Sequence, residues 1–223
     1  METYVVRAWL PDRPGALGAV ASRIGAVGAD VIGIEILETG GGRAIDELVV
    51  QLPDAGLVDL LVSEVSQVDG VDVEDVRPVS DAVHDPRLDA LETAAILVGA
   101  STVDELTASL AEHARRGVGA AWAVVLDVAG GSTVASDGPA PLARWLTAYV
   151  DGARSSANER QPGDIAWAPL PAARLAVVLG RDGQTFRARE RRQLAALARI
   201  VDTRFRELKH VDSRRSHPST VRP

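Results

Sequence analysis

The residues that could do chemistry by their type and spacing are concentrated in the segment DRPGAL, residues 12–17. Pro14 fixes φ near −65°, and Gly15 lets the backbone or a ligand approach closely. The apolar periodicity that starts at Ala16 predicts a helix, whose first N–H groups lack partners and carry a partial positive charge. Such a terminus binds carboxylates, and Asp12 offers a negative charge for an ammonium group. The segment therefore suits the two charges of an α-amino acid.

Asp30 begins the next predicted strand and is a second candidate for the ammonium group. The predicted ligand-binding residues are Asp12, Arg13, Pro14, Gly15, Ala16, Leu17, Asp30, Val31 and Ile32. Several of them have a purely structural alternative. Asp12 can cap the helix or close the turn. Arg13 can be a solvated surface charge, and Asp30 can be a turn residue that binds no ligand.

Other kinds of chemistry find little support. The chain has no cysteine, and its four histidines are scattered without metal-ligand spacing, at His84, His113, His210 and His217. Asp46 and Glu47 are adjacent in a predicted strand, so they point to opposite faces and form no acid–base pair. No nucleophile motif, phosphate-binding loop or dinucleotide fingerprint occurs. We predict no catalysis, no metal and no cofactor.

The first 80 residues alternate between strand and helix patterns. Strands are predicted at 4–10, 31–37, 44–52 and 71–76, the last stopped by Pro78, and helices at 16–27 and 57–68. This βαββαβ order predicts a ferredoxin-like antiparallel sheet with both helices on one face. The other face, rich in Val, Ile and Trp, would be an apolar patch that requires a partner.

A second α+β domain is predicted after a short polar linker. Helices are expected at 88–98, 103–115, 141–150 and 187–209, and strands at 120–127, 133–136, 165–170 and 174–180. Ser101 or Thr102 can cap the second of these helices. The predicted domains are residues 1–79 and 87–209, joined by a linker at 80–86 and followed by a disordered tail at 210–223.

The first half resembles the ACT domain, a small-molecule-sensing module of amino-acid metabolism. Asp12, Pro14, Gly15 and Leu17 match the family's first corner, and the segment GADV at 28–31 matches the start of its second strand. Many relatives carry Asn at the position of Asp30. The resemblance covers residues 3–79 and implies amino-acid binding near an interface between two such modules.

The second half resembles a GAF domain. The stretches that begin LETAAILVGAS and APLPAARLAVVLG carry the resemblance, with Pro169, Leu170, Leu179, Phe186, Glu190 and Leu194 in family positions. Residues 137–163, where such domains usually build a ligand pocket, match nothing in the family. The resemblance implies a role in dimerisation or docking.

The last predicted helix combines an apolar seam with many arginines. The seam has heptad-like spacing and consists of Leu194, Leu197, Val201, Phe205 and Leu208. From Arg187 onward the chain carries 11 Lys and Arg against 4 Asp and Glu, although the whole chain has a net charge of −7. Core or dimer packing explains the seam, and nucleic-acid binding is an alternative use of the arginines.

The sequence thus predicts a non-catalytic regulatory protein that senses an amino acid, forms a homodimer and relays a signal to an unidentified protein partner. No apolar run approaches the roughly 20 residues of a membrane span, and no signal peptide is indicated, so a cytoplasmic location is expected. One alternative is a structural or docking protein whose ACT fold has lost its ligand. Another is a nucleic-acid-associated regulator that works through the basic helix.

Overall fold

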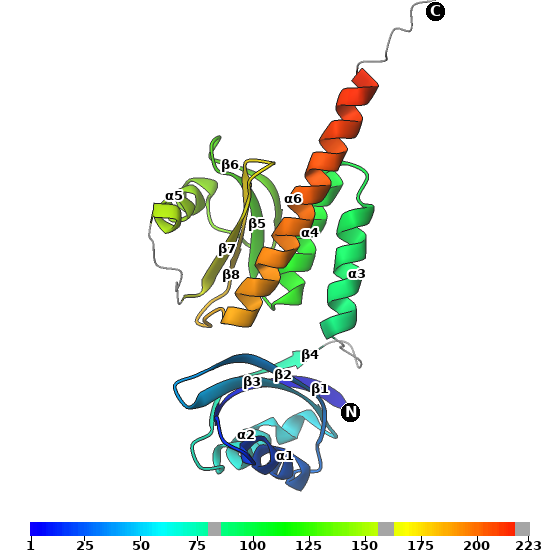
Figure 1. Ribbon diagram of the computed structural model, residues 1–223. Helices are drawn as coiled ribbons and strands as arrows, with labels where there is room; N and C mark the ends of the chain where they lie inside the picture. Colours follow the sequence, from blue (N-terminus) through cyan, green and yellow to red (C-terminus); the bar gives the residue numbers. More distant parts are fainter. Residues whose placement is uncertain (80–85, 156–162, 217–223) are drawn as a thin grey trace, which may run out of the picture. The chain divides into compact units, whose positions relative to one another are not determined.

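A computed structural model describes residues 1–79, 86–155 and 163–216, without side chains for 86–87 and 212–216. The chain divides into two compact units, Met1–Asp85 and Pro86–Pro223. Each unit packs helices against an antiparallel four-stranded sheet, which confirms the predicted α+β class (Figure 1). The predicted linker lies outside the described residues except for Pro86. Pro86 begins a helix, a position that favours proline.

The first unit has the predicted βαββαβ order. Its elements are β1 (Glu2–Pro11), α1 (Ala16–Ala26), β2 (Asp30–Gly40), β3 (Arg43–Leu52), the 3₁₀ turn η1 (Ala55–Leu57), α2 (Val58–Ser66) and β4 (Asp72–Val79). The sheet order is β2-β3-β1-β4, and α1 and α2 lie together on one face (Figure 1). Alternate residues of β1 and β3, including Val6, Leu10, Leu48 and Leu52, pack against Val20 and Ile24 of α1 and Leu61 of α2.

The prediction that Pro78 stops the last strand was wrong. β4 runs through Pro78 to Val79, and Pro78 pairs in register with Tyr4. In the sheet order, β4 is an edge strand with β1 as its only neighbour. Proline is tolerated on such a strand because its missing N–H can face away from the ladder.

The sheet face opposite the helices is not the purely apolar patch that the sequence suggested. Arg7 and Arg77 both form ion pairs with Glu47, at 2.7 and 2.9 Å. Trp9 on the same face donates its indole N–H to Glu74 at 2.7 Å. Ionic groups therefore alternate with the apolar residues of this face.

The second unit is a sheet with helices on both faces. Its elements are α3 (Pro86–Gly99), α4 (Val103–Gly117), β5 (Trp122–Asp127), β6 (Ser132–Asp137), α5 (Ala143–Ser155), β7 (Ile165–Leu170), β8 (Leu175–Gly180) and α6 (Ala188–Ser216). The sheet order is β6-β5-β8-β7. Helices α4 and α6 cover one face, with α3 packed on them, and α5 covers the other (Figure 1). The predicted cap is also present, since the Thr102 hydroxyl accepts from the Glu105 N–H at 3.1 Å.

The apolar seam of α6 belongs to the core of the second unit. Leu194, Leu197, Val201 and Leu208 are buried against α3, α4 and the sheet, and Phe205 is partly buried there. The structure thus uses the seam for core packing. Helix α6 continues to Ser216, past the predicted helix end at residue 209, and the disordered tail stays a prediction. No residue before Pro218 has to interrupt a helix, and 217–223 lie outside the described residues.

Candidate functional site

The corner between β1 and α1 is held by backbone hydrogen bonds. The Asp12 N–H donates to the Gly42 carbonyl at 2.9 Å, and the Arg13 N–H donates to the Pro11 carbonyl at 2.8 Å. Gly15 is the residue before the helix and has φ of 89°, a left-handed conformation that favours glycine. No side chain caps the helix. The proposed capping role of Asp12 is therefore not what the structure shows.

The first turn of α1 presents backbone N–H groups that the fold does not use. The Ala16 N–H donates to the Arg13 carbonyl at 3.3 Å, and the Ala19 N–H donates to the Gly15 carbonyl at 3.0 Å. Among the described residues, none accepts a hydrogen bond from the N–H of Gly15, Leu17 or Gly18. Free amides at a helix N-terminus attract a carboxylate.

The side chains of the predicted segment play different parts. The Asp12 carboxylate is exposed and has no hydrogen-bond partner among the described residues. Arg13 is 59% exposed and lies 3.9 Å from Asp69, so it is a surface charge. Pro14 is also exposed, whereas Ala16 is buried and Leu17 packs against the core. The segment thus anchors itself through Ala16 and Leu17 and presents Asp12 to solvent.

The structure does not bring Asp30, Val31 and Ile32 to this corner within one chain. Asp30 pairs with Gln51, whereas Asp12 follows the pair between Pro11 and Arg43. Gln51 lies eight positions after Arg43 in β3, a span of roughly 26 Å at 3.3 Å per residue. The prediction that Asp30 lies beside the corner was therefore wrong for a single chain. The reason is that α1 carries the chain back along the sheet, so β2 starts where β1 starts.

Asp46 is the residue at this end of the sheet that the predicted site omits. It pairs in register with Ala8 and Ile36, and it shares the helix-facing side of β3 with Leu48. Its exposed fraction is only 4%, and its Oδ1 has no hydrogen-bond partner in the described part of the chain. Burial raises the pKa of Asp46, and the negative charge of Asp12 raises it further.

Glu47 points to the other face of the sheet, as predicted, where it accepts hydrogen bonds from Arg7 and Arg77. Asp46 and Glu47 therefore do not act as a pair. The sequence does contain a signal for Asp46, because this acid interrupts the largely apolar run AIDELVV. Its neighbours on the same side of the strand, Ala44 and Leu48, are buried.

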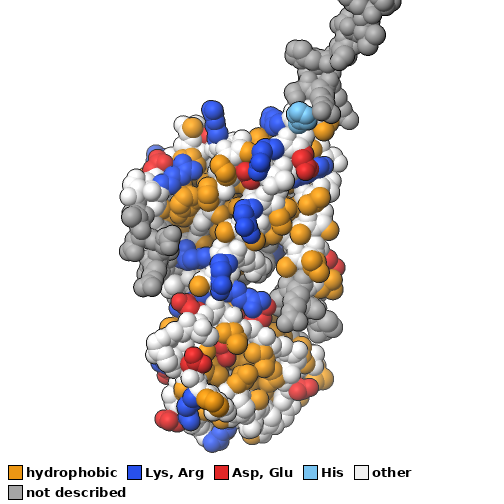
Figure 2. All heavy atoms as spheres, viewed as in Figure 1, with side chains coloured by type: hydrophobic (Ala, Val, Ile, Leu, Met, Phe, Trp, Pro, Cys, Tyr) orange, Lys and Arg blue, Asp and Glu red, His pale blue; other side chains and the backbone are white. Residues whose placement is uncertain are grey.

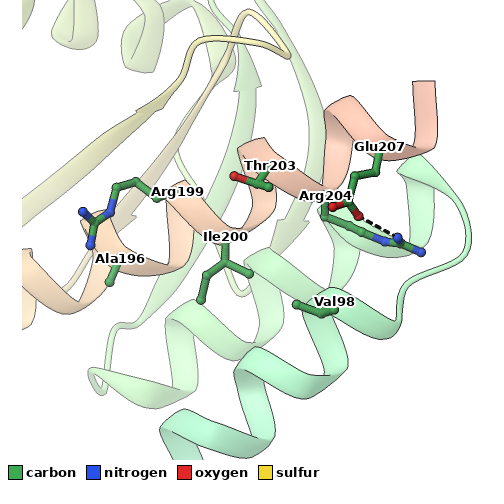
Figure 3. Close-up of a pocket in the computed structure, with 7 residues that line it drawn as sticks. All are labelled: Val98, Ala196, Arg199, Ile200, Thr203, Arg204 and Glu207. Carbon is green, nitrogen blue, oxygen red and sulfur yellow. Dashed lines mark hydrogen bonds and ion pairs between the residues drawn. The ribbon is translucent and has the colours of Figure 1, made fainter. Parts of the chain in front are cut away.

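A hollow lies on the surface of the second unit, between α3 and α6. This groove of about 430 Å³ is lined by Val98, Ala196, Arg199, Ile200, Thr203, Arg204 and Glu207 (Figure 3). The Arg204 guanidinium donates to the Ala100 carbonyl at 2.9 Å and to Glu207 at 2.9 Å. Because these polar groups already pair within the chain, the groove offers mainly apolar contact.

Side chains fill the space between α5 and the face of the second sheet that it covers. Leu146 and Val150 of α5 are fully buried against Trp122, Val124 and Leu126 of β5. Residues 156–162 of the segment that matched no family pattern lie outside the described residues.

Several arginines of α6 contact their own unit. Arg191 donates to the carbonyls of Phe186 and Gly163, and Arg206 donates to that of Asp202. Part of the basic charge of α6 therefore stabilises the second unit itself.

Neither sequence comparison identifies a family. No family model matches the chain, and no curated protein matches it. Among solved structures, an unknown protein from Galdieria sulphuraria aligns over 95% of this chain and 94% of its own, with 14% identity and a TM-score of 0.34. A protein described as a glycine cleavage system transcriptional repressor aligns over 93% and 92%, with 13% identity and a TM-score of 0.33. At these values neither similarity supports a functional argument.

Two other kinds of feature are absent from the described residues. No helix there combines the length and apolar character that crossing a membrane requires. The same residues hold no group of three or more His, Cys, Asp or Glu side chains arranged to bind a metal ion.

Proposed function

We propose that this protein is a non-catalytic regulator that binds an amino acid at the first turn of α1. The observation that carries the proposal is the set of free N–H groups at Gly15, Leu17 and Gly18 beside the unpaired Asp12 carboxylate. The amides suit the ligand's carboxylate, and Asp12 suits its ammonium group. The resemblance of the segment DRPGAL to ACT domains supports the same class of ligand.

The proposed regulation requires two copies of the chain. We propose a homodimer in which ligand shifts the balance between arrangements by binding one of them more tightly. Asp30, Val31 and Ile32 would join the corner only from a neighbouring copy, because their own α1 separates them from it. The GAF-like second unit would serve dimerisation or signal relay, consistent with its filled core.

Exposed apolar side chains on α3, next to the partly buried Ile200 of α6, support a dimer through the second unit. Leu91 and Val98 of α3 are 69% and 55% exposed, and Val98 shares the groove with Ile200 of α6. Figure 2 shows hydrophobic side chains on this face of the unit with Lys and Arg among them. Covering such a surface removes apolar area from water, which favours association.

Thermal denaturation with each of the twenty standard amino acids tests the binding proposal. A ligand at 100 times its dissociation constant adds about 2.7 kcal/mol to the free energy of unfolding. For a chain of this size the midpoint should rise by roughly 5–10 °C. The variant Gly15→Asp places a negative charge against the free amides and should abolish the shift. Absence of any shift would favour a purely structural or docking protein.

A further inference from the structure

We infer that Asp46 is the principal acceptor for the ammonium group of the bound amino acid. This inference rests on the proposed function and names a residue that the sequence pattern omits. Asp12 then has a secondary role, as an exposed negative charge at the edge of the site.

The topology brings Asp46 to the correct end of the sheet. β3 begins beside the end of β1, with Arg43 opposite Pro11 and Asp46 opposite Ala8. Helix α1 starts from that same end of β1 and packs on the face that Asp46 shares with Leu48. The free amides of α1 and the Asp46 carboxyl therefore lie at one end of the sheet and on one face.

The state of the Asp46 side chain calls for a cationic partner. Fully buried carboxylates are normally paired or hydrogen-bonded, because an isolated buried charge is costly. Oδ1 of Asp46 has no such partner among the described residues, and the residue is only 4% exposed. A structural acid on this strand would be expected to pair as Glu47 does with Arg7 and Arg77.

The surroundings of Asp46 are apolar or negative. Its register neighbours are Ala8 on β1 and Ile36 on β2, and Ala44 and Leu48 flank it on β3. The charged group that acts on Asp46 is the Asp12 carboxylate, from the segment just before α1. An arriving ammonium group would meet two negative charges, while the ligand's carboxylate would meet the positive end of α1. This arrangement selects a zwitterion over a simple acid.

The test compares wild type with Asp46→Asn and with Asp59→Asn, which changes an exposed acid of α2 in the same unit. Each protein is titrated with the twenty standard amino acids, with acetate and with methylammonium. We expect Asp46→Asn to weaken binding of the amino acid recognised by wild type at least tenfold at pH 8 and to leave acetate binding unchanged. Asp59→Asn should bind like wild type.

The pH profile gives a second readout that a merely structural role would not produce. Wild-type affinity should rise with pH as Asp46 ionises, and Asp46→Asn should lack this rise. Equal affinities and equal profiles for wild type and Asp46→Asn would overturn the inference while leaving the proposed function intact. If no amino acid binds wild type, the proposed function fails and this inference fails with it.

Discussion

Asp46 and Asp12 lie at the same end of the first sheet, close enough for the charge of Asp12 to raise the pKa of the buried Asp46 carboxyl. Burial is the larger cause of this shift, and both effects disfavour the ionised form. The fold therefore keeps an acid at a position where the ionised carboxylate lowers the free energy of unfolding. Such an arrangement is expected when a group is retained for binding.

The raised pKa of Asp46 predicts how the free energy of unfolding depends on pH. The folded-state pKa is raised above its unfolded value of about 3.9, so the folded chain binds more protons between the two values. The free energy of unfolding then falls as pH rises through that window. Asp46→Asn should increase the free energy of unfolding at pH 7 by on the order of 1 kcal/mol. Urea denaturation at pH 7 and pH 3 checks this, and a gain that persists undiminished at pH 3 would contradict it.

Gly15 and Gly18 form a matched pair for testing the backbone of the corner. A Cβ at either position meets no atom within 4 Å, but only Gly15 has positive φ. Gly15→Ala should destabilise the protein by about 1–2 kcal/mol because alanine resists the left-handed conformation. Gly18→Ala lies in the helix and should stabilise it by up to about 1 kcal/mol. Chemical denaturation measures both, and equal effects would argue against the assigned conformation of Gly15.

The pair of Arg181 and Glu190 should dominate the polar stability of the second unit. The guanidinium donates to both carboxylate oxygens of Glu190, at 2.7 and 2.9 Å, and both residues are buried. Glu190→Ala leaves Arg181 buried without its charge partner and should cost about 3–5 kcal/mol. Glu207→Ala removes the exposed partner of Arg204 on the same helix and should cost less than about 1 kcal/mol. Comparable losses in thermal unfolding would contradict the assignment.

The apolar groove between α3 and α6 predicts the effect of a charge on assembly. Val98→Glu places a carboxylate in the groove and should shift the proposed dimer toward monomer. Val134→Glu changes an exposed valine of β6 that is 42% accessible and should leave the mass unchanged. Light scattering during size-exclusion chromatography measures both. A Val98→Glu variant with the mass of wild type would contradict a dimer that forms through this groove.

Local sequence patterns predicted most of the elements of the fold. The βαββαβ order followed from period-2 and period-3.6 patterns, and the cap at Thr102 followed from its position before Asp104 and Glu105. Pro78 was misjudged because only the sheet order shows that β4 lies at an edge. The end of α6 was misjudged because its last turns lack an apolar period, although nothing before Pro218 must stop them.

The candidate site was harder to predict because it depends on strand direction and on sheet faces. Asp30 begins the strand that follows α1, and from the sequence alone it was placed beside Asp12. It lies at the other end of the sheet, because α1 carries the chain back along the sheet before β2 begins. Asp46 could be assigned to the site only after the register placed it opposite Ala8 and on the side of α1.

The proposed sensing depends on the binding of an amino acid to the first turn of α1. The most direct test is amide NMR of the uniformly ¹⁵N-labelled protein during titration with the amino acid that raises its thermal midpoint most. We expect saturable shifts that are largest at the N–H groups of Gly15, Leu17 and Gly18. Shifts confined to other elements at saturation, with these three amides unmoved, would contradict it.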